Sequence, residues 1–369
     1  MHVLYVGHYR EASGWGQVTR DQILALDTAG VNVVPRSIDL GLAHAEVPER
    51  ILQLEQGNTK NCDIIIQHVL PHHMKYDSHF NKNIGMFEFE SFNIKHTSWV
   101  DHLNIMDEIW VPCSHMLDMP GIRKPCYLMP HACNVEEYNQ EYVPLEIPSL
   151  KNKFVFYFIG TYNRRKHISA LLRAFHTEFD PCEPVELVLK MNHPSMNSDD
   201  LAKEVYQLTQ KIKEHLKLYD DLNRYKNEII ITVNVSREEL LRLHATCHSF
   251  VCPSFGEAWC APAFDAMGMG KYVIASKVGG PNDYIDNGVN GALVNGKLEP
   301  IFGENESFPE FGTARELEFD ISISDLQYKM RHAYNNRGNF SALQQNARNT
   351  AKKYSYINVG SFMKERLNA

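Results

Sequence analysis

One stretch, residues 253–267, constrains the fold and chemistry of this chain more than any other; it reads PSFGEAWCAPAFDAM. Residues 248–252 before it, HSFVC, predict a short buried strand. Pro262 predicts the start of a helix, because a proline at the first helical position loses no hydrogen bond. Between strand and helix we expect a loop whose backbone N–H groups point outward at a helix N-terminus, which favours an anion.

Two carboxylates flank this predicted anion site. Glu257 lies on the loop, and Asp265, eight residues later, is expected in the first turn of the helix. Carboxylates accept hydrogen bonds from sugar hydroxyls, whereas N–H groups and basic side chains bind a diphosphate. The combination therefore fits a nucleotide sugar. The structural alternative is a solvated loop acid and an aspartate that suits the helix dipole.

The stretch resembles the E-x7-E signature of retaining glycosyltransferases with the GT-B fold, particularly glycosyltransferase family 4. Glu257 matches the first acid, and Asp265, one methylene shorter, stands for the second. Ala258 and Cys260 replace family glycines that let the backbone approach the donor phosphate, which these residues permit only if φ stays negative. The aromatic position, the proline and the helix start are matched by Trp259, Pro262 and Ala266-Met267.

The resemblance implies a role for each of these residues. Glu257 would hold hydroxyls of the donor sugar, and Asp265 would hold the ribose. Trp259, Cys260 and Ala261 would contact the donor beside the helix N-terminus. In the same family the loop after an earlier strand, predicted here over residues 228–233, holds the nucleotide base through backbone groups. The matching residues here are Val233 and Val235.

A basic loop follows the apolar strand predicted over residues 153–160, and it reads GTYNRRKH. It resembles the family's G-R…R-K-G loop, whose cations neutralise the donor diphosphate. Lys166 matches the lysine, while Thr161 stands at the usual arginine position, so that Arg164 or Arg165 must supply the second charge. The resemblance implies that Lys166 and Arg165 stabilise the departing diphosphate. The alternative is a solvated basic turn.

The N-terminal half opens with a predicted strand, a glycine loop at residues 13–16, a helix over 17–29 and a second strand. This order is the start of a doubly wound sheet. There is no complete G-x-G-x-x-G and no acid at ribose-binding spacing, so we expect no NAD site. By resemblance, Gly14 and Gly16 let the donor approach; the alternative is a tight turn without a ligand.

Acceptor-side candidates come from later strands of this half. Glu88 and Glu90 end a strand predicted over residues 83–89, and ligands of open α/β sheets bind beyond the carboxyl ends of strands. His131 lies in a turn that resembles the family's x-P-H/N-G-V-D segment. We expect no metal at the nearby histidines, because His72 and His73 are neighbours that point apart in an extended chain.

The predicted architecture is α/β, with two doubly wound, Rossmann-like domains facing a cleft. Residues 1–148 form an acceptor-binding domain and 149–353 a donor-binding domain, with a linker near 140–152. By resemblance, residues 354–369 form a terminal helix that returns to the first domain. Residues 297–315 are expected to be an irregular loop insertion.

Composition restricts the class of protein further. The chain has 369 residues, 44% of them hydrophobic, which suits two domain cores. The net charge of −8 gives no electrostatic argument for nucleic acid or anionic membrane. The eight cysteines include no C-x-x-C pair and are expected to be reduced in a cytoplasmic protein. No apolar run approaches the ~20 residues of a membrane span, and the N-terminus lacks a signal-peptide pattern.

The ordered motifs imply a retaining glycosyltransferase, a hexosyl- or pentosyltransferase that moves a sugar from a nucleoside-diphosphate sugar to a hydroxyl. A sugar or glycan is the leading acceptor. The nucleotide sugar is a substrate, and neither a cofactor nor a metal is implied. Two alternatives stay open. One is a phage-type DNA glycosyltransferase acting on a hydroxymethylated base, which the acidic charge weakens. The other is a catalytically degenerate nucleotide-sugar-binding protein with the same fold.

Overall fold

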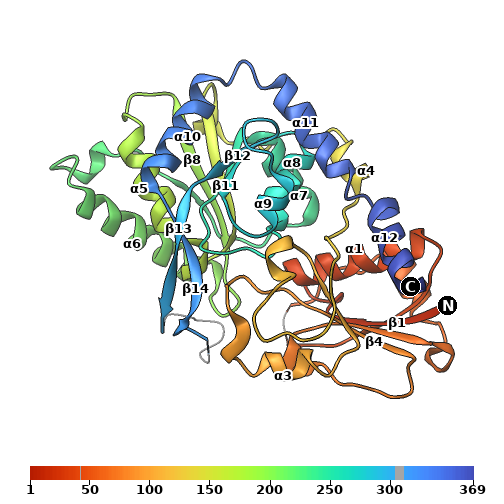
Figure 1. Cartoon of the computed structure of the whole chain (residues 1–369). Coiled ribbons are helices and arrows are strands. Elements are labelled where there is room, and N and C mark those ends of the chain that lie inside the picture. Colours follow the sequence, from red (N-terminus) through yellow and green to blue (C-terminus); the bar gives the residue numbers. More distant parts are fainter. Residues whose placement is uncertain (42, 304–310) are drawn as a thin grey trace. The chain divides into compact units, whose positions relative to one another are not determined.

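The computed structural model describes residues 1–41, 43–303 and 311–369. The chain divides into two compact units, and each is described by itself. Unit 1 comprises Met1–Glu137 together with Ala351–Ala369, and unit 2 comprises Tyr138–Thr350. The first and last residues, red and blue in Figure 1, therefore belong to the same unit.

Unit 1 contains a six-stranded sheet in the order β2-β1-β3-β4-β5-β6. All neighbouring strands pair in parallel. The order reverses its winding between β1 and β3, as in doubly wound folds. The strands are β1 (His2–Gly7), β2 (Asn32–Ser37), β3 (Ile64–His68), β4 (Lys82–Met86), β5 (Glu108–Val111) and β6 (Cys126–Leu128).

The first helix of unit 1, α1 (Gly14–Thr28), begins earlier than the sequence predicted. The Ser13 hydroxyl accepts a hydrogen bond from the Gly16 N–H at 3.1 Å, which is an N-cap. Gly14 and Gly16 are therefore in the first helical turn, not in a separate loop. The other helices of the unit are α2 (Glu49–Leu54), α3 (Trp99–Leu103) and α12 (Tyr356–Asn368), with α4 (Val135–Tyr138) at the unit boundary.

Helix α12 packs against α1 within unit 1 (Figure 1). Gly360 makes the close approach possible, since a Cβ there would lie 2.1 Å from the Ala25 carbonyl oxygen. The Tyr356 hydroxyl donates a hydrogen bond to Asp21 at 2.5 Å. Val359 and Met363 are buried in the same apolar cluster as the β1 residues. The end of the chain thus completes the core of the unit that contains its beginning.

Unit 2 contains a second parallel sheet of six strands, in the order β12-β11-β10-β7-β8-β9. Two Rossmann-like sheets confirm the predicted α/β class. The strands are β7 (Phe154–Thr161), β8 (Val185–Asn192), β9 (Ile229–Ile231), β10 (Ser249–Cys252), β11 (Tyr272–Ser276) and β12 (Ala292–Val294).

Helices of unit 2 connect these strands, and their buried side chains form one apolar core with the sheet. They are α5 (Ile168–Glu178), α6 (Ser198–Leu216), α7 (Arg237–Thr246), α8 (Ala261–Gly268), α9 (Gly280–Tyr284) and α10 (Ile323–Asn335), with α11 (Ser341–Lys352) crossing the unit boundary. Short 3-10 helices include η2 (Pro71–His73) in unit 1 and η6 (Arg164–Lys166) in unit 2. Among the described residues, no helix combines the length and apolar character needed to cross a bilayer.

The prediction of an irregular loop over residues 297–315 is wrong for those residues that the structure describes. β13 (Gly296–Phe302) and β14 (Thr313–Ile321) pair antiparallel as a hairpin, and residues 304–310 lie outside the described chain. Leu317, Phe319 and Ile321 alternate with acidic residues, which is the period of a strand. Pro300 lies within β13, and a proline inside a run of residues argues against a strand.

Candidate functional site

The loop between β10 and α8 carries the residues that the sequence singled out. α8 starts at Ala261, and its N-cap, Cys260, has φ 65° and ψ 70°. Cys260 therefore does not meet the condition of a negative φ that the sequence analysis set for close approach of its backbone to a donor phosphate. A left-handed conformation costs an L-residue roughly 1–2 kcal/mol, so surrounding packing must hold it. Asp265 is also placed differently, because it lies beyond the first turn of α8.

The turn at Gly279 and Gly280 packs directly against the backbone of this loop. Gly279 has φ +62°, and a Cβ on it would lie 1.5 Å from the Glu257 carbonyl oxygen. A Cβ on Gly280 would lie 2.6 Å from the Trp259 Cα. The Gly280 N–H donates to the Ala258 carbonyl oxygen at 3.2 Å. The two backbones touch, which only glycine permits at these positions.

Glu257 is the centre of the site and is 4% exposed. Its Oε1 accepts hydrogen bonds from Lys166 Nζ at 2.5 Å and from Ser254 Oγ at 2.6 Å. Arg165 Nη1 lies 3.2 Å from Oε2 and donates to the Gly256 carbonyl oxygen at 2.6 Å. The structure thus brings together the three residues predicted to be catalytic. Ser254, which the sequence analysis missed, joins them.

The basic loop and the acidic loop are also tied through their backbones. The Phe255 N–H donates to the Arg165 carbonyl oxygen at 2.9 Å. The expectation that the N–H groups of this loop point outward is therefore wrong for Phe255. Because the backbone contact fixes one loop against the other, the Lys166 and Glu257 side chains meet in a defined geometry.

In this cluster, charge pairing shifts the pKa values more than burial does. Burial would raise the pKa of Glu257, but Lys166 and Arg165 lower that pKa to about 2. Burial would lower the pKa of Lys166, and Glu257 instead raises it. Carboxylate and ammonium are both ionised at neutral pH, so the loop holds a buried positive charge that depends on Glu257.

Asp265 lies in a second charged group. Its carboxylate accepts hydrogen bonds from the Arg237 guanidinium at 2.5 and 2.9 Å and from the Tyr138 hydroxyl at 2.7 Å. Burial would raise the pKa of Asp265, but Arg237 lowers it. The sequence predicted the capped helix that starts at Arg237. Nothing in the sequence linked that helix to Asp265 or to Tyr138.

The two neighbouring arginines of the basic loop have different partners. Arg165 faces Glu257, whereas Arg164 donates two hydrogen bonds, at 2.5 and 2.6 Å, to Glu318 of β14. The Arg164 guanidinium also lies over the Phe255 ring, 4.6 Å from its centroid. The hairpin that the sequence analysis treated as a loop thus supplies a partner to a predicted donor-binding residue.

The remaining predicted donor residues of unit 2 lie around these groups. The Trp259 ring is 4% exposed and packs on Phe264 and Tyr284, with centroids 5.2 and 5.1 Å away. Ala261 is the first residue of α8. Val233 and Val235 follow β9, and the Val233 side chain is 54% exposed.

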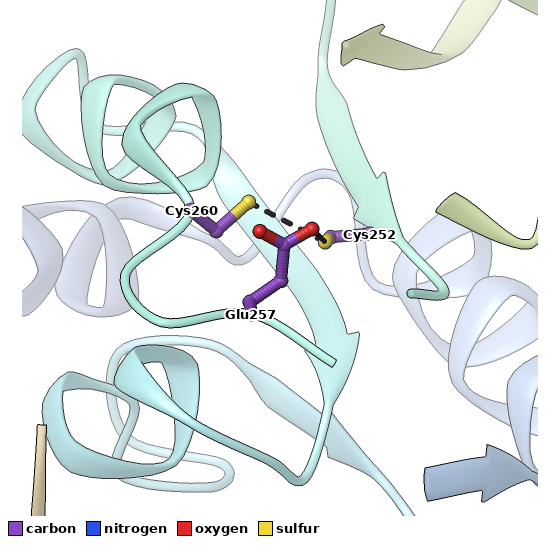
Figure 2. A group of neighbouring side chains, drawn as sticks. All are labelled: Cys252, Glu257 and Cys260. Atoms are coloured by element: carbon purple, nitrogen blue, oxygen red, sulfur yellow. Dashed lines mark hydrogen bonds between the residues drawn. The ribbon is translucent and has the colours of Figure 1, made fainter. Parts of the chain in front are cut away.

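Two thiols flank Glu257, and Figure 2 shows them pointing toward its carboxylate. Cys252 Sγ lies 3.4 Å from Cys260 Sγ, and one ligand atom of each of the three residues lies within 4.8 Å of the others. Within the described part of the chain this spacing could hold a metal ion, which the sequence did not indicate. However, Lys166 and Arg165 already contact the carboxylate, and their charges would oppose a cation.

In unit 1, Glu88 is the centre of a histidine cluster. Its Oε1 lies 2.7 Å from His68 Nε2 and 3.1 Å from His131 Nε2, and His68 Nδ1 lies 2.8 Å from the Tyr5 hydroxyl. Burial would raise the pKa of Glu88, but the two histidines hold it well below its usual range. Glu90, two residues after Glu88, is half-buried.

Other candidates of unit 1 differ from expectation in detail. A Cβ on Gly16 would lie 2.0 Å from the Glu11 carbonyl oxygen, whereas one on Gly14 would meet nothing within 4 Å. Only Gly16 is therefore required by packing. His72 and His73 belong to η2, with ring centroids 4.1 Å apart, so the prediction that they point apart is wrong.

Comparison with known proteins finds similarity both in part of the sequence and in the fold. Residues 146–300 match the family model described as "Glycosyl transferases group 1". Sucrose synthase 4 of Oryza sativa subsp. japonica is 26% identical over 142 residues, which are 38% of this chain and 17% of that protein. The match thus spans less than a fifth of this relative's length.

Solved structures are similar over the whole chain. Sucrose-phosphate synthase from Thermosynechococcus elongatus aligns with a TM-score of 0.66 at 14% identity, covering 100% of this chain and 98% of that one. Anabaena Alr3699/HepE, in complex with UDP and glucose, aligns with a TM-score of 0.65 at 14% identity and covers 100% of both chains. The predicted resemblance is confirmed: the chain has the GT-B fold, and residues 146–300 match the group 1 glycosyltransferases.

Proposed function

We propose that this protein is a retaining glycosyltransferase that moves a sugar from a nucleoside-diphosphate sugar to a hydroxyl of a sugar or glycan. The observation that carries the proposal is the contact of Lys166 and Arg165 with Glu257, inside the region that matches the group 1 family. Unit 2 would bind the donor and unit 1 the acceptor.

The cations suit the leaving group of this reaction. When the bond between the anomeric carbon and the phosphate oxygen breaks, the bonding electrons stay on the diphosphate. The ammonium of Lys166 and the guanidinium of Arg165 stabilise that developing charge. Glu257 keeps Lys166 protonated while it is buried, and its carboxylate can accept hydrogen bonds from hydroxyls of the donor sugar.

Bond formation follows from the same arrangement. The acceptor oxygen bonds to the anomeric carbon on the face that the diphosphate leaves, and its proton passes to a phosphate oxygen. No protein nucleophile enters this scheme. We propose that a metal is not needed, because the basic loop supplies the positive charge that a cation would otherwise provide.

The first experiment measures thermal stabilisation of the whole chain by UDP, GDP, ADP and CDP. UDP and UDP-glucose come first, because HepE forms a complex with UDP and glucose. A nucleotide at ~100 times its Kd should add roughly 2.7 kcal/mol of stability. Lys166→Ala should abolish the response, whereas Lys203→Ala, at an exposed lysine of α6, should retain it.

Product analysis then tests the reaction itself. With the donor identified, transfer to a panel of monosaccharides should give a product with the donor's anomeric configuration, read from its anomeric proton signal. Lys166→Ala should lower turnover at least about 100-fold, the scale of losing one preorganised charge contact. Failure of every nucleotide to stabilise the protein would overturn the proposal; an inverted product would overturn retention alone.

A further inference from the structure

Two cysteine side chains meet inside the candidate site of unit 2. Cys252 is the last residue of β10 and Cys260 is the N-cap of α8, and the two residues are 1% and 7% exposed. Their sulfur atoms lie 3.4 Å apart, beside the Glu257 carboxylate (Figure 2). Two thiols in contact are the reduced form of a potential disulfide, which needs only the removal of two electrons and two protons.

The backbone conformation of Cys260 is one that cysteine adopts at a cost. Its φ of 65° lies in the left-handed region, which glycine adopts freely and other L-residues do not. The Cys260 side chain also makes no capping hydrogen bond to the first turn of α8, all of which the structure describes. What the side chain adds at this position is its contact with Cys252. A role for the second sulfur atom would explain why a cysteine stands there.

The surroundings make Cys252 the more reactive of the two thiols. The hydrogen bond that it shares with Cys260 lowers the pKa of the Cys252 thiol, and the Lys166 ammonium adds to this effect, against burial and the charge of Glu257. The same hydrogen bond raises the pKa of the Cys260 thiol. The thiolate is the form that attacks an oxidant. The pair therefore combines an attacking thiol with a resolving one.

Burial restricts the oxidant to a small molecule. Exchange with another disulfide requires that disulfide to reach the attacking sulfur, which the 1% exposure of Cys252 opposes. Hydrogen peroxide has only two heavy atoms, and the 7% exposure of Cys260 provides an edge at which it can enter. A peroxide is therefore the class of oxidant that this pair fits.

The oxidation balances in two steps. The Cys252 thiolate attacks one oxygen of hydrogen peroxide, the O–O bond breaks, and the leaving hydroxide takes up a proton to become water; Cys252 is then a sulfenic acid. The Cys260 sulfur attacks the Cys252 sulfur, the S–O bond breaks, and the hydroxyl leaves as water with the Cys260 proton. The two thiols together lose two electrons, and the peroxide is reduced to two molecules of water. A dithiol reductant reverses the change.

A disulfide at this position would distort the loop that carries Glu257. The sulfur atoms would approach from 3.4 Å to about 2 Å, which draws the start of α8 toward the end of β10. The loop cannot yield toward Gly279, because the backbones of Gly279 and Glu257 are in direct contact. The displacement therefore falls on the N-cap of α8 and on the Glu257 side chain, whose Oε1 lies 2.5 Å from Lys166 Nζ.

We propose that Cys252 and Cys260 form a reversible disulfide with peroxide, and that this disulfide weakens binding of the donor nucleotide. The bond itself depends only on the two thiols, whereas its effect on the donor rests on the proposed transferase function. The site would lose its donor under oxidising conditions and regain it when a dithiol reduces the bond.

The first test detects the bond in the whole chain. Reduced protein is treated with hydrogen peroxide, free thiols are blocked with iodoacetamide, and a chymotryptic digest is analysed by mass spectrometry without reductant. Chymotrypsin cleaves after Phe255 and Trp259, so the two cysteines fall in different peptides. We expect a peptide pair joined through Cys252 and Cys260, which dithiothreitol separates. Two blocked thiols, or sulfinic and sulfonic acids without a joined pair, would overturn the proposal.

The second test measures the effect on the nucleotide. Calorimetric titration with UDP, GDP, ADP and CDP compares reduced, peroxide-treated and re-reduced protein. The nucleotide that binds the reduced protein should bind the oxidised protein at least about tenfold more weakly, and its affinity should return after dithiothreitol.

Three variants show which cysteines carry the effect. Cys252→Ser should bind the nucleotide as the reduced wild type does and should no longer respond to peroxide. Cys260→Gly, which suits the left-handed backbone, should also lose the peroxide response, so the test holds even if one variant fails to fold. Cys182→Ser, at an exposed cysteine of unit 2, is the matched control and should keep the response.

The outcomes separate this inference from the proposed function. A joined peptide pair with unchanged nucleotide affinity would overturn the control of donor binding. A peroxide response that persists in both Cys252→Ser and Cys260→Gly would also overturn it, because another oxidised group would then be the cause. The absence of nucleotide binding in reduced wild type would overturn the transferase function and the control of donor binding together, and the peptide map would still decide whether the disulfide forms.

Discussion

Each unit buries a carboxylate beyond the carboxyl end of its sheet, but the partners differ in kind. Glu257 of unit 2 faces Lys166, whereas Glu88 of unit 1 faces His68 and His131. Lysine keeps its charge across the physiological range, while imidazoles exchange protons near neutrality. Unit 2 therefore presents a fixed positive charge, suited to a diphosphate. Unit 1 instead presents a carboxylate between two imidazoles, whose nitrogens can donate or accept hydrogen bonds.

Both carboxylates stay ionised, but different neighbours keep them so. Burial alone would raise the pKa of each. At Glu257 the opposing effect comes mainly from full charges on Lys166 and Arg165, and at Glu88 from the field and hydrogen bonds of two histidines. Removing the Glu257 carboxylate should therefore change the free energy of unfolding by a different amount than removing the Glu88 carboxylate.

The largest expected effect is the loss of stability in Glu257→Ala. This change leaves the Lys166 ammonium buried without its counter-charge, which costs about 3–5 kcal/mol. Glu88→Ala leaves imidazole nitrogens of His68 and His131 without their carboxylate partner, and should cost about 1–3 kcal/mol. Urea unfolding at pH 7 measures both. Glu204→Ala, at an exposed residue of α6, should stay within about 0.5 kcal/mol of the wild type. Equal losses at the two sites would contradict the contrast between the units.

The next effect concerns acid stability. The pKa of His8 is about 4 in the folded protein against 6.5 for a free histidine, so the unfolded chain binds more protons between these values. Stability should therefore fall as the pH drops through this window. His8→Phe should remove about 3 kcal/mol of the loss by pH 4. The neighbouring His68, His73 and Glu88 remain in both proteins, so the difference isolates His8.

Unit 2 should respond in another pH range. The pKa of Glu257 is about 2 in the folded protein against 4.5 for a free glutamate, so its contribution is present above 4.5 and is lost as the pH falls toward 2. Unfolding free energies of His8→Phe, Glu257→Gln and His79→Phe are compared at pH 7, at pH 4 and near pH 2. His8→Phe should reduce the loss of stability between pH 7 and pH 4, and Glu257→Gln the loss below pH 4.5. An unchanged acid slope in His8→Phe would show that His8 is not a buried neutral histidine.

A smaller difference in stability is expected between substitutions of Gly14 and Gly16, to which the sequence analysis gave the same role. Gly16→Ala would place a Cβ against the Glu11 carbonyl oxygen and should cost about 1–3 kcal/mol. Gly14→Ala meets open space and should be neutral or stabilising by about 0.5 kcal/mol. Thermal midpoints measure both changes. Equal tolerance at the two positions would mean that α1 can shift away from Glu11.

The sequence predicted those features of the site that lie within single motifs. Glu257 and Lys166 were recognisable because their loops follow the pattern of a known family, and the structure brings the two side chains together. The parallel sheets followed from short apolar strands alternating with helices. These features depend on local sequence and on the topology of the fold.

The features that were missed depend on contacts between distant segments. Arg237 and Tyr138 reach Asp265 from positions 28 and 127 residues away, and nothing in their local sequence indicates this. The left-handed Cys260 depends on tertiary packing, because local preference opposes it. The position of His8 directly after β1 is readable from the sequence, but its burial depends on segments distant in the chain.

The smallest effect tests the contrast between Arg164 and Arg165. Glu318 holds Arg164 in two hydrogen bonds. The family resemblance allows Arg164 to bind the donor diphosphate, and in that role Glu318 would compete with the diphosphate. Glu318→Gln should therefore strengthen binding of the stabilising nucleotide, by up to about fivefold, because a partly exposed ion pair is worth up to ~1 kcal/mol. Calorimetric titration of the whole chain measures the change.

Glu204→Gln provides the control, because Glu204 is an exposed residue of α6 and lies outside the hairpin. It should leave nucleotide affinity unchanged. Weaker binding in Glu318→Gln would reverse the interpretation, since Glu318 would then position Arg164 for the diphosphate instead of competing for it. Either change would show that the β13–β14 hairpin influences donor binding. No change would leave Arg165 and Lys166 as the cations that distinguish unit 2 from unit 1.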